Sequence, residues 1–85
     1  MKKFEYIITE PVGIHARPAG MLVKAASVYK SSITIEKDGK AADVKRLMAL
    51  MAVGVKCDEK VTFKIEGADE DIAVAELEAF CKENL

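Results

Sequence analysis

Three segments of this 85-residue chain alternate apolar and polar side chains with a period of two, at residues 4–9, 32–36 and 61–66. This period predicts β-strands, and only one side of each strand is consistently apolar. Strands of this kind belong to an antiparallel sheet with one covered face and one face in water. The pair Asp38-Gly39 predicts a two-residue type I′ hairpin turn, which adds a short fourth strand over residues 40–43.

Three further segments carry the period of a helix, with apolar residues three and four positions apart in residues 19–26, 47–51 and 73–81. Pro18 lies in the first turn of the first helix, where its missing N–H does no harm, and Gly54 follows the second. Acidic residues at 69–71 suit the start of the last helix.

These helices must cover the apolar face of the sheet. The sequence therefore predicts an α+β fold, a two-layer open-faced sandwich. A four-stranded antiparallel sheet is covered on one face by three helices, in the order strand, helix, strand, strand, helix, strand, helix. No linker or composition break divides the chain, so we expect one domain over residues 1–85.

Charge and hydropathy exclude several classes of protein. The 13 basic and 14 acidic residues give a net charge of −1, whereas a module that binds nucleic acid normally carries a basic excess. The longest apolar run, residues 47–55, is far shorter than the ~20 residues of a membrane span. Glu5 and Glu10 interrupt the apolar stretch that an export signal needs. We therefore expect a cytoplasmic protein with no nucleic-acid partner and no insertion into a membrane.

The two cysteines, Cys57 and Cys81, form no disulfide-framework pattern, and their spacings to each other and to His15 match no zinc pattern. We expect free or buried thiols, no metal site and no cofactor. The chain carries no Walker loop, no catalytic triad and no paired-carboxylate signature.

His15 is the only histidine, and it directly precedes the first predicted helix in Gly13-Ile14-His15-Ala16-Arg17-Pro18. The first N–H groups of a helix lack internal partners and, with the helix dipole, form an anion site. The same field disfavours the imidazolium cation, which leaves a nitrogen lone pair free to act as a nucleophile. Arg17 offers a planar fork of donors that suits phosphate oxygens. These groups together favour the transfer of a phosphoryl group.

Each of these residues also has a simpler interpretation. A lone histidine is more often a surface or capping residue, and a lone arginine is more often a solvated surface charge. A free-standing small-molecule enzyme is disfavoured, because the chain is short and offers no second catalytic group.

The chain resembles the HPr family of histidine-containing phosphocarrier proteins of the bacterial sugar phosphotransferase system. The run from Gly13 to Ala19 matches the family's active-site signature, Asp38-Gly39-Lys40 matches its hairpin, and Lys45 through Gly54 looks like its second helix and following loop. The resemblance covers essentially the whole chain.

The resemblance implies a relay between proteins. HPr proteins accept a phosphoryl group from enzyme I, which phosphoenolpyruvate charges, and pass it to the IIA domains of sugar transporters. On this basis His15 is phosphorylated at Nδ1, and Arg17 with the backbone N–H groups of Ala16 and Arg17 holds the phosphoryl oxygens. The chain would be a monomeric phosphoryl carrier with a phosphohistidine intermediate rather than a stand-alone enzyme.

The second predicted helix is apolar almost all round, at Leu47, Met48, Leu50 and Met51. One interpretation places all four side chains in the core. The other leaves Leu47 and Met48 exposed as a docking surface, to which methionine is suited because it adapts to several partners. The resemblance favours docking, and it implies partner contacts at Gly20, Lys24, Leu47, Met48 and Met51.

Position 46 departs from the family pattern, because Arg46 stands where most HPr proteins carry a serine, which a dedicated kinase phosphorylates in many Gram-positive bacteria. Arg46 has no hydroxyl, so the chain has no regulatory serine at this position. Arg46 could instead steer acidic partners toward the docking surface, or it could be a neutral surface charge. A regulatory paralogue that acts by protein binding, or a carrier of a parallel nitrogen-related phosphotransferase system, remains the alternative function.

Overall fold

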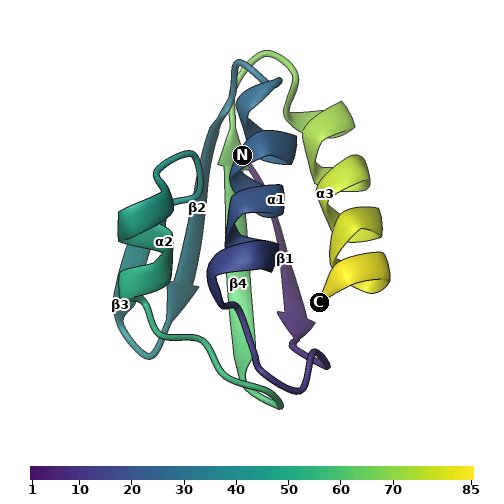
Figure 1. Cartoon of the computed structure of the whole chain (residues 1–85). Helices are drawn as coiled ribbons and strands as arrows, with labels where there is room; N and C mark the ends of the chain where they lie inside the picture. The colour runs from purple at the N-terminus through teal and green to yellow at the C-terminus, as the bar shows by residue number, and fades with distance from the viewer.

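A four-stranded antiparallel sheet forms one layer of the protein, and three helices cover one of its faces (Figure 1). The computed structural model covers residues 1–85. It confirms the α+β open-faced sandwich and the order of elements expected from the sequence. None of the helices combines the length and the apolar character needed to cross a membrane. The elements are β1 (Lys2–Ile7), α1 (Ala16–Ser27), β2 (Ser32–Lys37), β3 (Lys40–Asp43), α2 (Leu47–Ala52), β4 (Lys60–Glu66) and α3 (Glu70–Asn84).

The strands lie side by side in the order β1-β4-β2-β3, and every neighbouring pair is antiparallel. The predicted hairpin between β2 and β3 is confirmed, since Asp38 and Gly39 have positive φ angles of 50° and 81°. The first strand differs slightly from its predicted range of 4–9, because it begins at Lys2 and ends at Ile7. Ile8 is buried, and its backbone bonds to the loop before β4.

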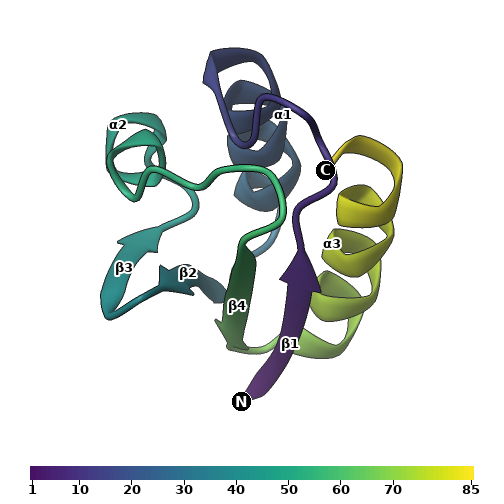
Figure 2. The same cartoon turned by 90° about the horizontal axis from the view of Figure 1, so that it is seen from below.

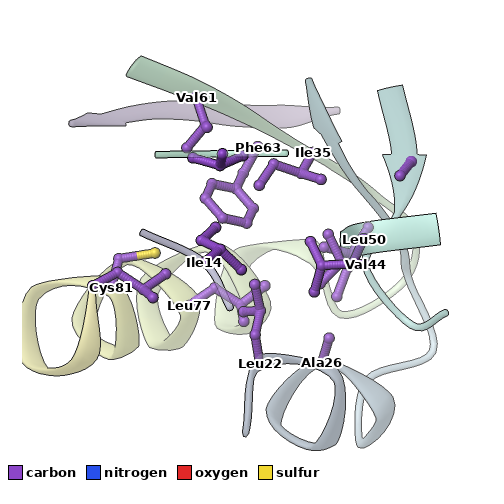
Figure 3. Packing of buried hydrophobic residues seen from close by; sticks show 14 of the residues in the cluster. Ile14, Leu22, Ala26, Ile35, Val44, Leu50, Val61, Phe63, Leu77 and Cys81 are labelled. Carbon is purple, nitrogen blue, oxygen red and sulfur yellow. The ribbon is translucent and has the colours of Figure 1, made fainter. Parts of the chain in front are cut away.

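Buried apolar side chains fill the space between the sheet and the helices (Figure 3). Phe63 lies near the centre of this core, with Ile35 and Val61 beside it on the sheet, and Leu22 and Leu77 point toward it from α1 and α3. All five side chains are at most 1% exposed. Each such side chain contributes roughly 1.5–3 kcal/mol by its burial, so the core holds the helices firmly on the sheet.

Three segments that are distant in the sequence meet at one end of the molecule (Figure 2). They are the connection from β1 to α1, the loop from α2 to β4, and the C-terminal end of α3. Backbone hydrogen bonds join the first segment to each of the other two. The start of α1 therefore lies in a part of the protein that is braced from two sides.

Candidate functional site

His15 occupies the N-cap position of α1, with extended backbone angles of φ −104° and ψ −170°. Its side chain makes no capping hydrogen bond, and the first turn of α1 contains no acidic residue. The first N–H groups of a helix have no acceptor within the helix. Because Pro18 has no N–H, the N–H groups of Ala16 and Arg17 are the donors that the first turn of α1 offers to an anion.

The backbone just before His15 is fixed by the loop between α2 and β4. The Ile14 N–H donates to the Val55 carbonyl over 3.1 Å, and the Ile14 side chain is only 7% exposed. Gly13 has a φ of +76°, and a Cβ at this position would lie 2.4 Å from the Val55 oxygen and 2.7 Å from Cα of Lys56. Only glycine fits this close approach, so the signature glycine sets where His15 stands.

The C-terminal residue holds the other side of the same connection. A main-chain oxygen of Leu85 accepts hydrogen bonds from the N–H groups of Thr9 and Glu10, over 2.5 and 2.7 Å. The Leu85 side chain is 2% exposed and belongs to the hydrophobic core. Nothing in the sequence pattern pointed to this contact, because it joins residues that are about as far apart in the chain as possible.

His15 and Arg17 line a shallow hollow of about 290 Å³ at this end of the protein. Arg17 is exposed and takes part in none of the ion pairs of the protein, so its guanidinium is free to bind an anion. Two carboxylates, of Glu10 and Glu83, share the hollow. Neither carboxylate was expected beside His15 from the sequence. The remaining lining residues are Pro18, Met21 and Asn84.

The arrangement suits a nucleophile that receives an anionic group. A half-buried imidazole stands beside two backbone donors and one unpaired arginine. α2 also begins without a capping side chain, but its N-cap residue is Arg46, which has no nucleophilic lone pair. The start of α1 is therefore the helix start that combines an anion site with a nucleophile.

Three apolar side chains of α2 are exposed, namely the expected Leu47 and Met48 and also Met51. Leu47, Met48 and Met51 are 40%, 78% and 37% exposed, whereas Leu50 is 1% exposed. The alternative that all four side chains belong to the core is wrong for three of them. We call the exposed side chains of Leu47, Met48 and Met51 the α2 surface.

The outward face of α1 begins beside His15 and extends the exposed surface around it. Arg17, Gly20, Met21 and Lys24 follow the spacing of one helix face, and α1 packs beside α2. Met21 is 41% exposed, and the helical period did not point to it because it lies outside the apolar stripe of the helix. A Cβ at Gly20 would meet no atom within 4 Å, so the backbone packing does not require glycine there.

The two cysteines lie in different settings, and neither has a disulfide partner. Cys57 is half-buried in the turn before β4, whereas Cys81 is fully buried on α3. Burial raises the pKa of the Cys81 thiol to about 12, so this thiol stays protonated at neutral pH.

Comparison with known proteins identifies similar chains along nearly the whole sequence. Residues 2–83 match the family model described as the PTS HPr component phosphorylation site. The phosphocarrier protein HPr of Mycoplasma genitalium is 40% identical over 85 residues, which is 99% of this chain and 97% of that protein. HPr of Mycoplasma capricolum is 43% identical over 74 residues, or 87% and 83% of the two chains. A crystal structure of HPr from Thermoanaerobacter tengcongensis superposes with a TM-score of 0.94, at 36% identity, over 99% of this chain and 94% of that one.

Proposed function

The chain belongs to the HPr family of phosphocarrier proteins of the phosphotransferase system, and from this premise we propose that it relays a phosphoryl group through His15. His15 accepts the group from enzyme I at Nδ1 and gives it up to the IIA domains of sugar transporters. The observation that carries this proposal is the position of His15. It is the N-cap residue of α1, its side chain makes no capping hydrogen bond, and it lines the hollow together with the unpaired Arg17.

The transfer is a displacement at phosphorus. The lone pair of His15 Nδ1 forms a bond to phosphorus, while the bond from phosphorus to the donor group of enzyme I breaks. Phosphoryl transfer depends mainly on positioning and on stabilising the charge of the phosphoryl oxygens. The N–H groups of Ala16 and Arg17 and the Arg17 guanidinium supply the donors for these oxygens.

The same geometry supports release of the group to the next partner. Glu10 and Glu83 share the hollow with His15, and their negative charge repels a bound phosphoryl group. The hollow is shallow, so a partner protein must cover it to complete each transfer site. These features favour a carrier that is charged and discharged by other proteins over a stand-alone enzyme.

The α2 surface and the outward face of α1, with Gly20 and Lys24, form the contact region for enzyme I and the IIA domains. Exposed methionines provide an apolar area that can adapt to more than one partner. Arg46 is exposed and lies 3.8 Å from Asp43, at the start of α2. A regulatory role that depends on a seryl phosphate at this position is chemically impossible, which favours the carrier over a serine-regulated paralogue. We expect the relay to operate in the cytoplasm with the chain as a monomer.

The direct test combines the protein with phosphoenolpyruvate and enzyme I and measures its mass. We expect one added phosphoryl group that acid removes, and none on the His15→Ala variant. Circular dichroism of the variant serves as the control for folding, because the His15 side chain makes no capping bond that the fold needs. An acid-stable phosphate, or a phosphate that persists on His15→Ala, would contradict the proposal.

A further inference from the structure

We propose that Lys37 and Glu59 are positioning residues for His15: their ion pair clamps the loop between α2 and β4, and this loop holds the backbone on which His15 stands. The inference deepens the proposed function and rests on it for its kinetic consequence. Neither residue belongs to the HPr signature around His15 or touches the hollow beside it.

The ion pair is the most enclosed one in the protein. Lys37 Nζ lies 3.0 Å from Oε1 and 3.1 Å from Oε2 of Glu59, and the two side chains are only 12% and 32% exposed. Every other ion pair includes at least one side chain that is more than 40% exposed. Solvent therefore screens the Lys37–Glu59 pair less than the others.

Both partners of the pair also bind the loop backbone. Lys37 Nζ donates to the Gly54 carbonyl over 3.0 Å, and Glu59 Oε1 accepts from the Lys56 N–H over 2.7 Å. The hydrogen bond from Lys37 and that from the Lys56 N–H hold the pKa of Glu59 below its ordinary value, so the carboxylate stays ionised. One ammonium and one carboxylate thus tie the two ends of the segment from Gly54 to Glu59 together.

The clamped segment is the one that contacts the backbone before His15. The Val55 carbonyl accepts the Ile14 N–H, and the backbone of Val55 and Lys56 fills the space beside Gly13. At the end of the segment, the Ile8 N–H donates to the Glu59 carbonyl over 3.0 Å, and Ile8 accepts from the Asp58 N–H over 2.7 Å. Figure 2 shows this loop running beside the connection from β1 to α1.

Loss of the clamp would free the loop without removing any group that touches the phosphoryl oxygens. The Ile14 N–H would then lose a fixed acceptor, and His15 would sample a wider range of positions relative to the Ala16 and Arg17 amides. Small misplacements of a reacting group are costly in rate, so the effect should appear in the transfer step. The α2 surface and Lys24 are unchanged, so docking should be affected much less.

The test measures steady-state phosphorylation by enzyme I for substituted proteins. We expect Lys37→Gln to lower kcat by about fivefold to tenfold with a change in KM of less than about twofold. Lys37→Arg should restore kcat, because arginine can donate to both Gly54 and Glu59. The double exchange Lys37→Glu with Glu59→Lys should not restore it, since a carboxylate at position 37 would face the Gly54 carbonyl. Glu36→Gln is the matched control, because it breaks the neighbouring ion pair between Glu36 on β2 and Lys64 on β4.

A second measurement tests the clamp without any phosphoryl transfer. Hydrogen exchange of the Ile14 amide, followed by NMR, should be faster in Lys37→Gln than in Glu36→Gln, and normal in Lys37→Arg. Equal exchange and equal kcat in Lys37→Gln and Glu36→Gln would overturn the inference. If enzyme I fails to phosphorylate the unsubstituted protein, the proposed function is wrong, whereas the exchange measurement still decides whether the clamp exists.

Discussion

The first turns of α1 and α3 differ in their acidic residues, although the N-cap side chain makes no capping hydrogen bond in either helix. α1 follows His15, which makes no capping bond, and has no acidic residue in its first turn. α3 follows Asp69 and has Glu70 and Asp71 in its first turn. The Asp69 carboxylate accepts hydrogen bonds from the Ser31 hydroxyl and the Ser31 N–H, and also from the N–H of Lys30 over 2.8 Å.

This difference between the two helix starts suggests that one of them stabilises the fold and the other serves function. Acidic side chains at the start of a helix compensate the positive end of its dipole, and at α3 they also connect the helix to the segment before β2. At α1 the same positive end is left for a ligand from outside. On the proposed function, the protein places its stabilising charges at the start of α3 and its reactive group at the start of α1.

Making α1 resemble α3 should have the largest effect on transfer. Ala16→Glu places a carboxylate where the proposed function puts the phosphoryl oxygens, and we expect phosphorylation by enzyme I to slow by about 100-fold. The same substitution should stabilise the fold by about 0.3–1 kcal/mol through the helix dipole. Rates and urea unfolding of Ala16→Glu and of the uncharged control Ala16→Gln would be compared. Equal slowing in both would indicate crowding rather than charge.

Removal of the Arg17 side chain should cost somewhat less. A hydrogen bond to a charged group contributes about 2 kcal/mol, so we expect Arg17→Ala to slow transfer by about 30-fold. Stability should stay the same, because Arg17 has no ion-pair partner in the protein. Arg17→Lys keeps the charge but loses the planar fork, so its rate should be intermediate. An unchanged rate in Arg17→Ala would show that this guanidinium does not contact the phosphoryl group.

An exposed apolar side chain should matter for docking near α1 and not at the start of α3. We expect Met48→Glu to weaken binding of enzyme I by about tenfold, because it adds a charge to a surface that must lose water on contact. Ile72→Glu is the matched control, since Ile72 is 60% exposed in the first turn of α3. Titration calorimetry of both variants would decide, and equal affinities would remove the α2 surface from the contact region.

The start of α3 should respond to substitution in stability alone. Ser31 is 1% exposed, and its hydroxyl donates to Asp69. We expect Ser31→Ala to lower the free energy of unfolding by about 1 kcal/mol, less than a fully buried hydrogen bond to a charge would contribute, because the Asp69 carboxylate is only half-buried. The rate of phosphorylation at His15 should not change. A slower rate in a fully folded Ser31→Ala protein would mean that the two helix starts are coupled.

Acid should weaken the start of α3 in a way that depends on Asp69. The hydrogen bond from the Ser31 hydroxyl, followed by that from the Lys30 N–H, holds the pKa of Asp69 below its ordinary value. Its ionised form therefore stabilises the fold fully above about pH 4, and this stabilisation is lost as the pH falls through the lower pKa of the folded state. Urea midpoints measured between about pH 5 and pH 2 should fall less steeply for Asp69→Asn than for the unsubstituted protein. Parallel slopes would contradict this assignment.

Local patterns of the sequence predicted most of the fold. The hairpin at Asp38-Gly39, the acidic start of α3 and the place of His15 before α1 each depend on residues close together in the chain. Periodicity also identified all three helices, although it could not decide how much of α2 is exposed. That depends on which neighbours cover it, and only Leu50 of its long apolar side chains reaches the core.

The long-range contacts that hold the backbone around His15 were not predictable in the same way. One of these contacts is the ion pair between Lys37 and Glu59, and the other is the pair of hydrogen bonds from Thr9 and Glu10 to Leu85. Neither contact leaves a periodic or local signal, because each depends on how strands and helices are arranged in space. The position of Glu10 and Glu83 in the hollow beside His15 was not predictable for the same reason.

The central claim is that the open start of α1 receives the phosphoryl group on His15. The most direct measurement follows the backbone amide signals of the ¹⁵N-labelled protein by NMR while enzyme I and phosphoenolpyruvate phosphorylate it. We expect the largest shifts at the amides of Ala16 and Arg17, and unchanged signals for the Lys30 and Ser31 amides that Asp69 already holds. Unmoved Ala16 and Arg17 amides in the fully phosphorylated protein would contradict the claim.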